Sequence, residues 1–353
     1  MQPVEAMDVN FKIDTNIDKQ DIVFYSVLQE PFSVYGLIHE NGKFRRMPEA
    51  VAQSVSPGVE YFYCKTSGGR VRFKTDSQYI AISAKMTSII KTSHFAMTGA
   101  AGFDLYIGEN ANCKFTNAYR PPFEMTDGYQ SVFEFPDRQM REVTMNFPLY
   151  SDVCELYIGL QKDAVVEKAT PYSTEKPVVF YGSSVTQGCC ATRPGNPYPA
   201  ILSRWFDFDF INLGFSGNAK GEQNMSDYIA GLDMSMFVMD YDHNAPDPEH
   251  LQKTHHKMYQ TIRAAHPNIP IIMMTAMSLP HILEQHYERR DIIYQSYQDA
   301  VMSGDQNVYF WDGSKEFAPY ADYGTIEGSH PNDHGFYGMA KSLSKIIAPI
   351  FHK

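Results

Sequence analysis

A serine follows a predicted buried strand in the segment VVFYGSSVTQG. The strand ends at Gly182, and Ser183 and Ser184 come directly after it. A serine hydroxyl becomes a nucleophile when a general base takes its proton, and backbone N–H groups of the following turn can stabilise an oxyanion. Thr186 stands where a GxSxG elbow would have its second glycine, which excludes that motif. Taken alone, the segment is equally compatible with a Ser/Gly turn that has no chemical role.

A histidine that can act as the base lies near the C-terminus, in the segment GTIEGSHPNDHGFYG. Glu327 precedes His330 by three residues, so a short loop can fold the carboxylate back onto the imidazole. Such a carboxylate fixes the tautomer of the ring and stabilises the imidazolium that forms during proton transfer. The alternative is that His330 is a surface loop residue. In either case we expect the Asn332/Asp333 pair to cap the helix that follows.

Two further segments place small or amide residues after predicted strands. INLGFSGN contains Gly217 and MDYDHNAP contains Asn244. The N–H of Gly217 and the side-chain amide of Asn244 are both suitable donors to a developing oxyanion. Each is an ordinary loop residue when taken alone. We expect the four segments to converge at one edge of a sheet, which gives them more weight together.

Two regions with different periodicity must position these residues. From about Asp21 to Leu160, short segments rich in aromatic and β-branched residues are separated by turn residues, and residues 79–84 alternate as a strand does. We predict an N-terminal β-sandwich (jelly-roll-like) domain over residues 1–170, without an amphipathic helix in it.

From residue 176 to residue 353, apolar strands alternate with longer helical segments. Strands are predicted from Val178, Asp209, Met234, Ile269 and Asn307, and helices over residues 198–206, 223–232, 249–265, 284–301 and 334–350. This alternation predicts an α/β fold, with a flavodoxin-like three-layer α/β/α domain and right-handed crossovers. Ligands of such sheets bind beyond the carboxyl ends of the strands.

The ordered segments resemble the sequence blocks of the SGNH, or GDSL-like, hydrolases. GFDLY at residues 102–106 also resembles a motif of the β-sandwich domain found in one subgroup of these esterases. The resemblance implies Ser184 as nucleophile, His330 as base and Glu327 as the acid that orients it. It further implies an oxyanion hole made by the N–H groups of Ser184 and Gly217 and by the amide of Asn244.

Three positions depart from the family pattern. Ser183 replaces the aspartate of the GDS motif, which is not a triad member, and the neighbours of Asn244 differ from the usual Gly and Asp. Glu327 stands where aspartate is usual, and its extra methylene shifts the carboxylate by roughly 1 Å, a displacement that can cost on the order of 10²-fold in rate. A Ser–His dyad with a supporting glutamate is therefore an alternative to a full triad.

For substrate, the resemblance implies short-chain acyl esters, most often O-acetyl groups on carbohydrates, and it requires no cofactor or metal. Two other functions stay open. The same residues can serve an acyltransferase or a thioesterase. The departures at Glu327 and around Asn244 can instead mark a non-catalytic carbohydrate-binding protein.

Composition narrows the partners and the location. A length of 353 residues suggests two domains, and the net charge of −11 argues against nucleic acid and anionic membrane surfaces, which would repel the chain. Five cysteines without a CxxC spacing indicate neither a disulfide framework nor a zinc site. Since no signal peptide or long apolar run is evident, we expect a cytoplasmic protein that acts on a small-molecule or oligosaccharide ester; a homo-oligomer is compatible with the sequence.

Several other polar residues have a simpler interpretation. We expect Cys189 and Cys190 to pack in the interior or line a pocket, and Asp312 to form a turn. Solvated helix or loop positions are expected for the remaining residues of this kind, which are His255, His256, His281, His286, Arg289 and Arg290.

Overall fold

The computed structural model describes residues 1–3, 13–277 and 284–351, and in it the chain forms two units. Unit 1 contains Met1–Arg46, Cys64–Tyr172 and Thr192–Gly195, and unit 2 contains Met47–Tyr63, Ser173–Ala191 and Asn196–Lys353. Two short segments, Met47–Tyr63 and Thr192–Gly195, therefore belong to a different unit from the residues on either side of them.

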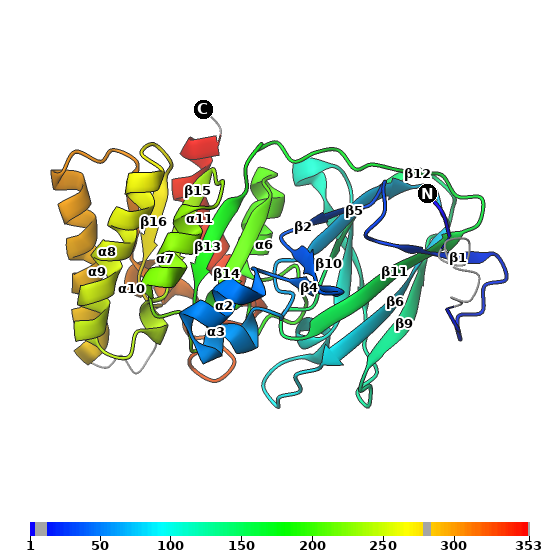
Figure 1. Cartoon of the computed structure of the whole chain (residues 1–353), viewed down its shortest axis with the longest axis horizontal. Coiled ribbons are helices and arrows are strands. Elements are labelled where there is room, and N and C mark those ends of the chain that lie inside the picture. Colours follow the sequence, from blue (N-terminus) through cyan, green and yellow to red (C-terminus); the bar gives the residue numbers. More distant parts are fainter. Residues whose placement is uncertain (4–12, 278–283, 352–353) are drawn as a thin grey trace. The chain divides into compact units, whose positions relative to one another are not determined.

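Unit 1 is a sandwich of two antiparallel sheets (Figure 1). One sheet has the order β1-β11-β6-β9, formed by Ile22–Ser26, Asp152–Gln161, Tyr79–Ser88 and Gly128–Glu134. The other has the order β12-β5-β10-β7-β8, formed by Val166–Glu167, Arg70–Thr75, Arg141–Asn146, Phe103–Ile107 and Lys114–Tyr119, with β2 (Ser33–Tyr35) also paired to β5. A separate hairpin consists of β3 (Ile38–Glu40) and β4 (Lys43–Arg45). The predicted sandwich is confirmed.

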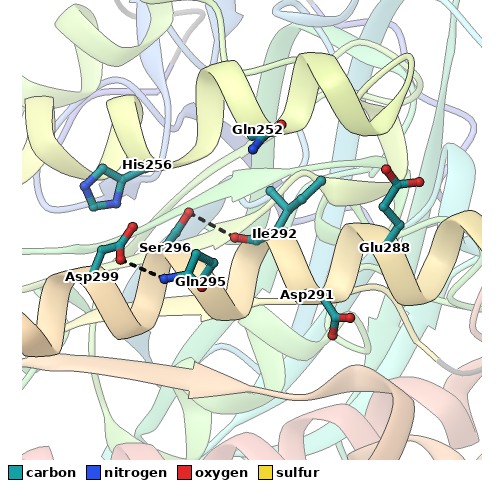
Figure 2. Close-up of a pocket in the computed structure, with 8 residues that line it drawn as sticks. All are labelled: Gln252, His256, Glu288, Asp291, Ile292, Gln295, Ser296 and Asp299. Carbon is teal, nitrogen blue, oxygen red and sulfur yellow. Dashed lines mark hydrogen bonds between the residues drawn. The ribbon is translucent and has the colours of Figure 1, made fainter.

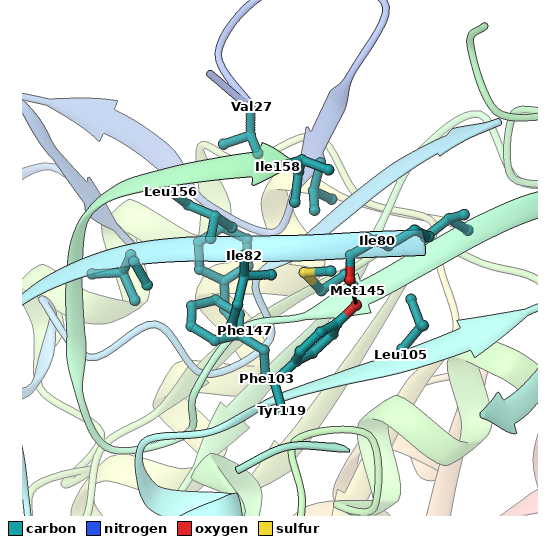
Figure 3. Packing of buried hydrophobic residues seen from close by; sticks show 14 of the residues in the cluster. Val27, Ile80, Ile82, Phe103, Leu105, Tyr119, Met145, Phe147, Leu156 and Ile158 are labelled. Atoms are coloured by element: carbon teal, nitrogen blue, oxygen red, sulfur yellow. Dashed lines mark hydrogen bonds between the residues drawn. The ribbon is translucent and has the colours of Figure 1, made fainter. Parts of the chain in front are cut away.

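One hydrophobic core lies between these two sheets (Figure 3). Ile82 comes from β6, and Phe103 and Met145 come from the facing sheet; all three are fully buried. The hydroxyl of Tyr119 donates to the carbonyl of Ile80 at 3.0 Å, so this polar group is satisfied inside the core. Burying each large side chain contributes about 1.5–3 kcal/mol, which makes this core the main source of stability for the unit.

Helices occur within the first 170 residues, so the prediction that none would interrupt the strands is wrong. The helix α4 (Met97–Ala100) lies in unit 1, whereas α2 (Glu49–Val55) and α3 (Pro57–Phe62) belong to unit 2. The sequence did contain a start signal for α3, because Ser56 accepts a hydrogen bond from the Val59 N–H and Pro57 occupies the first turn. Packing against α7 (Gln223–Ala230) supports α2.

Unit 2 is built on a parallel sheet with the order β14-β13-β15-β16-β17. The strands, named in chain order from β13 to β17, are Val178–Gly182, Phe210–Gly214, Met236–Asp240, Ile271–Met274 and Val308–Trp311. The long helices are α6 (Tyr198–Phe206), α7, α8 (Pro248–Ala265), α9 (Glu284–Met302) and α11 (Asp333–Phe351). This strand order is flavodoxin-like, as predicted. The helices α6 and α11, which contact each other, lie on one face of the sheet, and α7, α8 and α9 lie on the other (Figure 1).

The register of the sheet brings three strand ends to one level. Gly182 at the end of β13 pairs with Gly214 of β14 on one side and with Asp240 of β15 on the other. The loops that carry Ser184, Gly217 and Asn244 therefore leave the sheet side by side. No helix among the described residues has the length and apolar character needed to cross a membrane.

Candidate active site

Ser184 begins a single helical turn, α5 (Ser184–Gln187), directly after β13. The side chain of Ser183 caps this turn by accepting a hydrogen bond from the Val185 N–H at 3.2 Å. Gly188 ends it with a positive φ of 109°, a conformation that glycine adopts without steric cost. Ser184 is 8% exposed, so its position is set by the surrounding protein.

Two glycines let α5 lie directly on the strand ends. A Cβ atom at Gly182 would lie 2.2 Å from Thr186 Oγ1, and one at Gly214 would lie 2.2 Å from the backbone nitrogen of Gln187. No larger residue fits at either position unless the helical turn shifts. The close packing of α5 on the sheet edge therefore requires glycine at both positions.

His330 lies in a loop that precedes α11 and folds back on itself. Thr325 and Pro331 form an antiparallel bridge, and the Ile326 N–H donates to the carbonyl of His330 at 2.9 Å. Gly328 makes the turn with a φ of 82°. The N–H of Cys190 donates to the carbonyl of Pro331 at 3.1 Å, which ties this loop to the segment that follows Ser184.

The predicted serine, histidine and glutamate form a chain of hydrogen bonds. Ser184 Oγ lies 2.9 Å from His330 Nε2, and Glu327 Oε1 lies 2.6 Å from His330 Nδ1. The same carboxylate oxygen accepts the backbone N–H of His330 at 3.0 Å. Because a carboxylate can only accept, Nδ1 carries the proton in the neutral ring, which leaves the lone pair of Nε2 facing the serine hydroxyl.

Gly217 and Asn244 follow the two neighbouring strands. Gly217 has a φ of 69° and open space around its Cα. Asn244 closes the short helix η2 (Asp242–Asn244), and its Oδ1 accepts the Ala219 N–H at 3.3 Å, so the amide nitrogen is the end that remains to donate. Among the described residues, neither the Gly217 N–H nor the Asn244 Nδ2 has an acceptor.

Two family models match the sequence. Residues 175–348 match the GDSL-like lipase/acylhydrolase family, and residues 22–166 match the N-terminal region, named for its GxDLY motif, of SGNH-hydrolase-type esterases. The chain belongs to the GDSL-like lipase/acylhydrolase family. It is an SGNH-type hydrolase with the GxDLY N-terminal region, as the resemblance implied. No curated protein sequence matches this chain.

Solved structures with the same fold come from several bacteria. A proposed GDSL-like lipase from Bacteroides ovatus is 26% identical, with a TM-score of 0.85, and the match covers 94% of this chain and 98% of that one. A salicylyl-acyltransferase from a tetracycline biosynthetic pathway matches over the same shares at 18% identity and a TM-score of 0.77. A family two carbohydrate esterase from Cellvibrio japonicus is 12% identical, with a TM-score of 0.61, and this match also covers 94% of this chain and 98% of that one.

Two departures from the GDSL-like pattern now have a structural explanation. Ser183, in place of the aspartate, supplies the side-chain cap that α5 needs. Glu327, in place of the usual aspartate, reaches His330 Nδ1 at 2.6 Å despite its extra methylene. The Glu327 side chain is 39% exposed and the His330 side chain 27% exposed, so this end of the chain of hydrogen bonds lies close to solvent.

Sequence reasoning missed the buried polar residues that join the loops of this site. Gln187 Oε1 accepts the Ser216 N–H at 3.0 Å, which links α5 to the loop that carries Gly217. Asn212 Nδ2 donates to the carbonyl of Thr186 at 2.7 Å. The only signal was an amide in the middle of the apolar segment DFINLG, where a buried polar group requires a partner.

Two residues expected on solvated helix surfaces are buried. Arg289 is 8% exposed and donates to the carbonyl of Asp242 at 2.9 Å. His255 is 1% exposed and stacks on Tyr241, and burial lowers its pKa to about 3. Burial also lowers the pKa of His243, although the negative charge of Asp242 opposes this and the positive charge of Arg289 adds to it.

The remaining expectations concern single contacts. Asp312, predicted to form a turn, is instead the N-cap of the short helix α10 (Gly313–Glu316), and it pairs with Arg290 at 2.9 Å. Asn332 Oδ1 accepts the N–H groups of His334 and Gly335, which confirms that cap. Cys189 and Cys190 are buried, as expected, and hold free thiols. His281 lies outside the described residues.

A pocket lies between α8 and α9, apart from the strand ends that carry Ser184 (Figure 2). Its walls are mostly polar, and three of the lining residues are acidic. Two contacts in the walls are internal to α9: Gln295 donates to Asp299 at 2.8 Å, and Ser296 donates to the carbonyl of Ile292 at 3.2 Å. The full lining is Gln252, His256, Glu288, Asp291, Ile292, Gln295, Ser296 and Asp299. None of the residues predicted to be catalytic belongs to it.

Proposed function

We propose that the protein is a serine esterase that hydrolyses short-chain acyl esters, above all O-acetyl esters of carbohydrates. The observation that carries this proposal is the 2.9 Å separation between Ser184 Oγ and His330 Nε2. This distance lies within the range in which a general base can take the proton of its nucleophile. Glu327 holds the base in the required tautomer.

In the acylation step, His330 Nε2 accepts the proton of Ser184 Oγ while the oxygen attacks the ester carbonyl. The tetrahedral oxyanion accepts hydrogen bonds from the Gly217 N–H, the Asn244 amide and the N–H of Ser184. Collapse of this intermediate breaks the bond to the alcohol, which leaves with the proton that His330 returns. The product is an acyl group esterified to Ser184.

In the deacylation step, His330 takes a proton from water, and the resulting hydroxide attacks the acyl-enzyme. The same donors stabilise the second oxyanion, and its collapse releases the acid and returns the proton to Ser184. Each proton transfer passes through His330, so the imidazole must be neutral at the start of each step.

Two kinds of support favour carbohydrate acetyl esters. The family two carbohydrate esterase from Cellvibrio japonicus and an acetyl xylan esterase from Butyrivibrio proteoclasticus share the fold over more than nine tenths of this chain. The net charge of −11 also favours a neutral substrate over a polyanion.

The test is acetate release from acetylated xylan and acetylated manno-oligosaccharides, with p-nitrophenyl acetate as a general ester. Ser184→Ala should lower kcat by about 10⁴-fold or more, because the other groups of the site have no nucleophile to activate. Ser344→Ala is the matched control, since this partly buried serine lies on α11 and its hydroxyl donates to the carbonyl of Lys341 in the same helix. Equal rates for wild type and Ser184→Ala would overturn the proposal.

Acyl transfer to an acceptor alcohol is a second candidate. It is favoured by the fold of the salicylyl-acyltransferase, whose TM-score of 0.77 exceeds that of the carbohydrate esterase. Both reactions share the acyl-enzyme and differ in whether water or an alcohol attacks it. Analysis of products formed from an acyl ester in the presence of sugar alcohols distinguishes them: acetate alone supports hydrolysis, and a new ester supports transfer.

A further inference from the structure

The turn that carries Ser184 rests on a buried cluster of one carboxyl and two hydroxyl groups. Asp240 Oδ2 accepts hydrogen bonds from Thr186 Oγ1 at 2.8 Å and from the Tyr198 hydroxyl at 3.0 Å. The two hydroxyl oxygens lie 3.3 Å from each other. All three side chains are buried.

The cluster joins three elements of unit 2. Asp240 ends β15, Thr186 is the third residue of α5, and Tyr198 begins α6. A helix of four residues has almost no intrinsic stability, so contacts outside α5 must hold it in place. Thr186 stands two residues after the nucleophile and is therefore well placed to transmit those contacts to Ser184.

The composition of the cluster is costly for stability. Burial raises the pKa of Asp240 to about 7, hydrogen bonds from Thr186 and Tyr198 oppose this, and the negative charge of Asp242 adds to it. Thr186 and Tyr198 supply neutral hydroxyls to this carboxyl and no cation. An apolar cluster of the same volume is often neutral or more stabilising than a buried charged group. The polar cluster must therefore provide a benefit other than stability.

Directional bonds supply that benefit. Apolar contacts allow a short helical turn to slide or rotate by a fraction of an ångström, whereas two hydrogen bonds to one oxygen fix both its distance and its rotation. We propose that Asp240, Thr186 and Tyr198 are positioning residues that hold α5 so that the Ser184 hydroxyl stays aligned with His330. This inference rests on the proposed function, because alignment matters only if Ser184 is the nucleophile.

The central experiment replaces the hydroxyl of Thr186 without changing the shape of its side chain. In Thr186→Val the bond to Asp240 is lost, and kcat should fall about tenfold or more, since a misplacement of about 1 Å can cost 10²-fold. KM should change by less than about twofold, because substrate binding does not use this bond. Thr186→Ser keeps the hydroxyl and should restore most of the lost kcat.

A matched control is available in the same unit. Thr254 of α8 also forms a threonine–tyrosine hydroxyl pair, with Tyr241 at 2.9 Å, and its own hydroxyl donates to the carbonyl of His250 within α8. Thr254→Val should lose a similar amount of thermal stability while keeping its kcat. If Thr254→Val loses as much kcat as Thr186→Val, or if Thr186→Ser is no better than Thr186→Val, the cluster has only a structural role and the inference is overturned.

A second arm measures the dependence of kcat on pH for Asp240→Asn. The titratable groups that face Asp240 are Tyr198 and Asp242. Because protonation of His330 also shapes the pH profile, the readout is the difference between variants: the profile of Asp240→Asn should differ from that of wild type near pH 7, whereas the profile of Asp305→Asn should match it. Asp305 is a suitable control because it also accepts a tyrosine hydroxyl, that of Tyr259 at 2.7 Å, at a distance from α5 along the chain.

The two proposals fail in different ways. Inactive wild type, or an active Ser184→Ala, removes the proposed function. Active wild type with an inactive Ser184→Ala, together with unchanged kcat in Thr186→Val and a pH profile of Asp240→Asn that matches wild type, removes the positioning inference alone.

Discussion

The nucleophile block, residues 182–188, and the histidine loop, residues 324–332, carry the two partners of the proposed proton transfer and are built in different ways. In the nucleophile block every residue is buried, and α5 rests on glycines that leave no room for a side chain. In the histidine loop Glu327 and His330 are partly exposed, and Gly328 has open space around it. Hydrogen bonds within the backbone hold this loop in shape.

This difference suggests that packing fixes one partner in place, whereas hydrogen bonds hold the other more loosely. The nucleophile cannot move without moving the sheet edge, so its position is fixed by packing. The base is held by bonds that can break and re-form at low cost, because exposed hydrogen bonds contribute only about 0.5–1.5 kcal/mol each. In the proposed mechanism, this allows the imidazole to turn from the serine oxygen to the leaving oxygen.

The largest predicted effect concerns the charge under the nucleophile block. Because the folded pKa of Asp240 is about 7 while an unfolded aspartate titrates near 3.9, its contribution to stability is fully present below about pH 4 and is lost as pH rises through about 7. The loss is about 4 kcal/mol, at about 1.4 kcal/mol for each pKa unit. Asp240→Asn should therefore gain stability relative to wild type by about this amount between pH 4 and pH 8.

Urea unfolding at several pH values measures this effect. Glu327→Gln changes an exposed carboxylate in the histidine loop and serves as the control. Its free energy of unfolding should depend on pH in the same way as that of wild type. Parallel curves for wild type and Asp240→Asn would show that Asp240 is not the group responsible.

A somewhat smaller effect is predicted for glycine substitutions in the two regions. Gly182→Ala places a Cβ 2.2 Å from Thr186 Oγ1 and 2.3 Å from the carbonyl oxygen of Asp240, so we expect about 3 kcal/mol of destabilisation and loss of activity. Gly328→Ala meets no atom within 4 Å and costs only the strain of its φ of 82°, about 1–2 kcal/mol. Thermal unfolding compares the two, and equal losses would contradict the contrast between packing and open space.

The smallest effect separates activity from stability in the histidine loop. Glu327→Ala removes the acceptor for His330 Nδ1, and kcat should fall by about 10- to 100-fold, while the melting temperature stays within a few degrees because the side chain is partly exposed. Glu327→Gln keeps an acceptor oxygen and should retain more activity. If Glu327→Ala is fully active, the site works as a Ser–His dyad.

Much of this architecture could be predicted from sequence because strands and helices differ in the period of their apolar residues. The five strands and five long helices of unit 2 lie where alternation of the two patterns placed them. Ser184, Gly217, Asn244 and His330 could be singled out because the ends of parallel strands meet at one edge of a sheet. These residues converge because the strands are parallel, and the alternation of strands and helices in the sequence predicts a parallel sheet.

The burial of charged residues could not be predicted from residue type. Arg289 and His255 are polar, yet each is spaced four residues from an apolar position on the same helix face, Ile293 and Leu251 respectively, and both of these are fully buried. This four-residue spacing indicates a buried position on the helix more reliably than the polar residue type indicates an exposed one. The Asp240 cluster was hidden for another reason: its three members are far apart in the chain and meet only through the fold.

The interleaving of the two units also constrains how the gene can be divided. A fragment that begins at Ser173 lacks α2 and α3, which unit 2 takes from residues 47–63, and it leaves the α7 surface that α2 covers open to water. During synthesis, α2 and α3 leave the ribosome more than a hundred residues before the parallel sheet of the unit to which they belong. Neither half of the gene encodes an independent module.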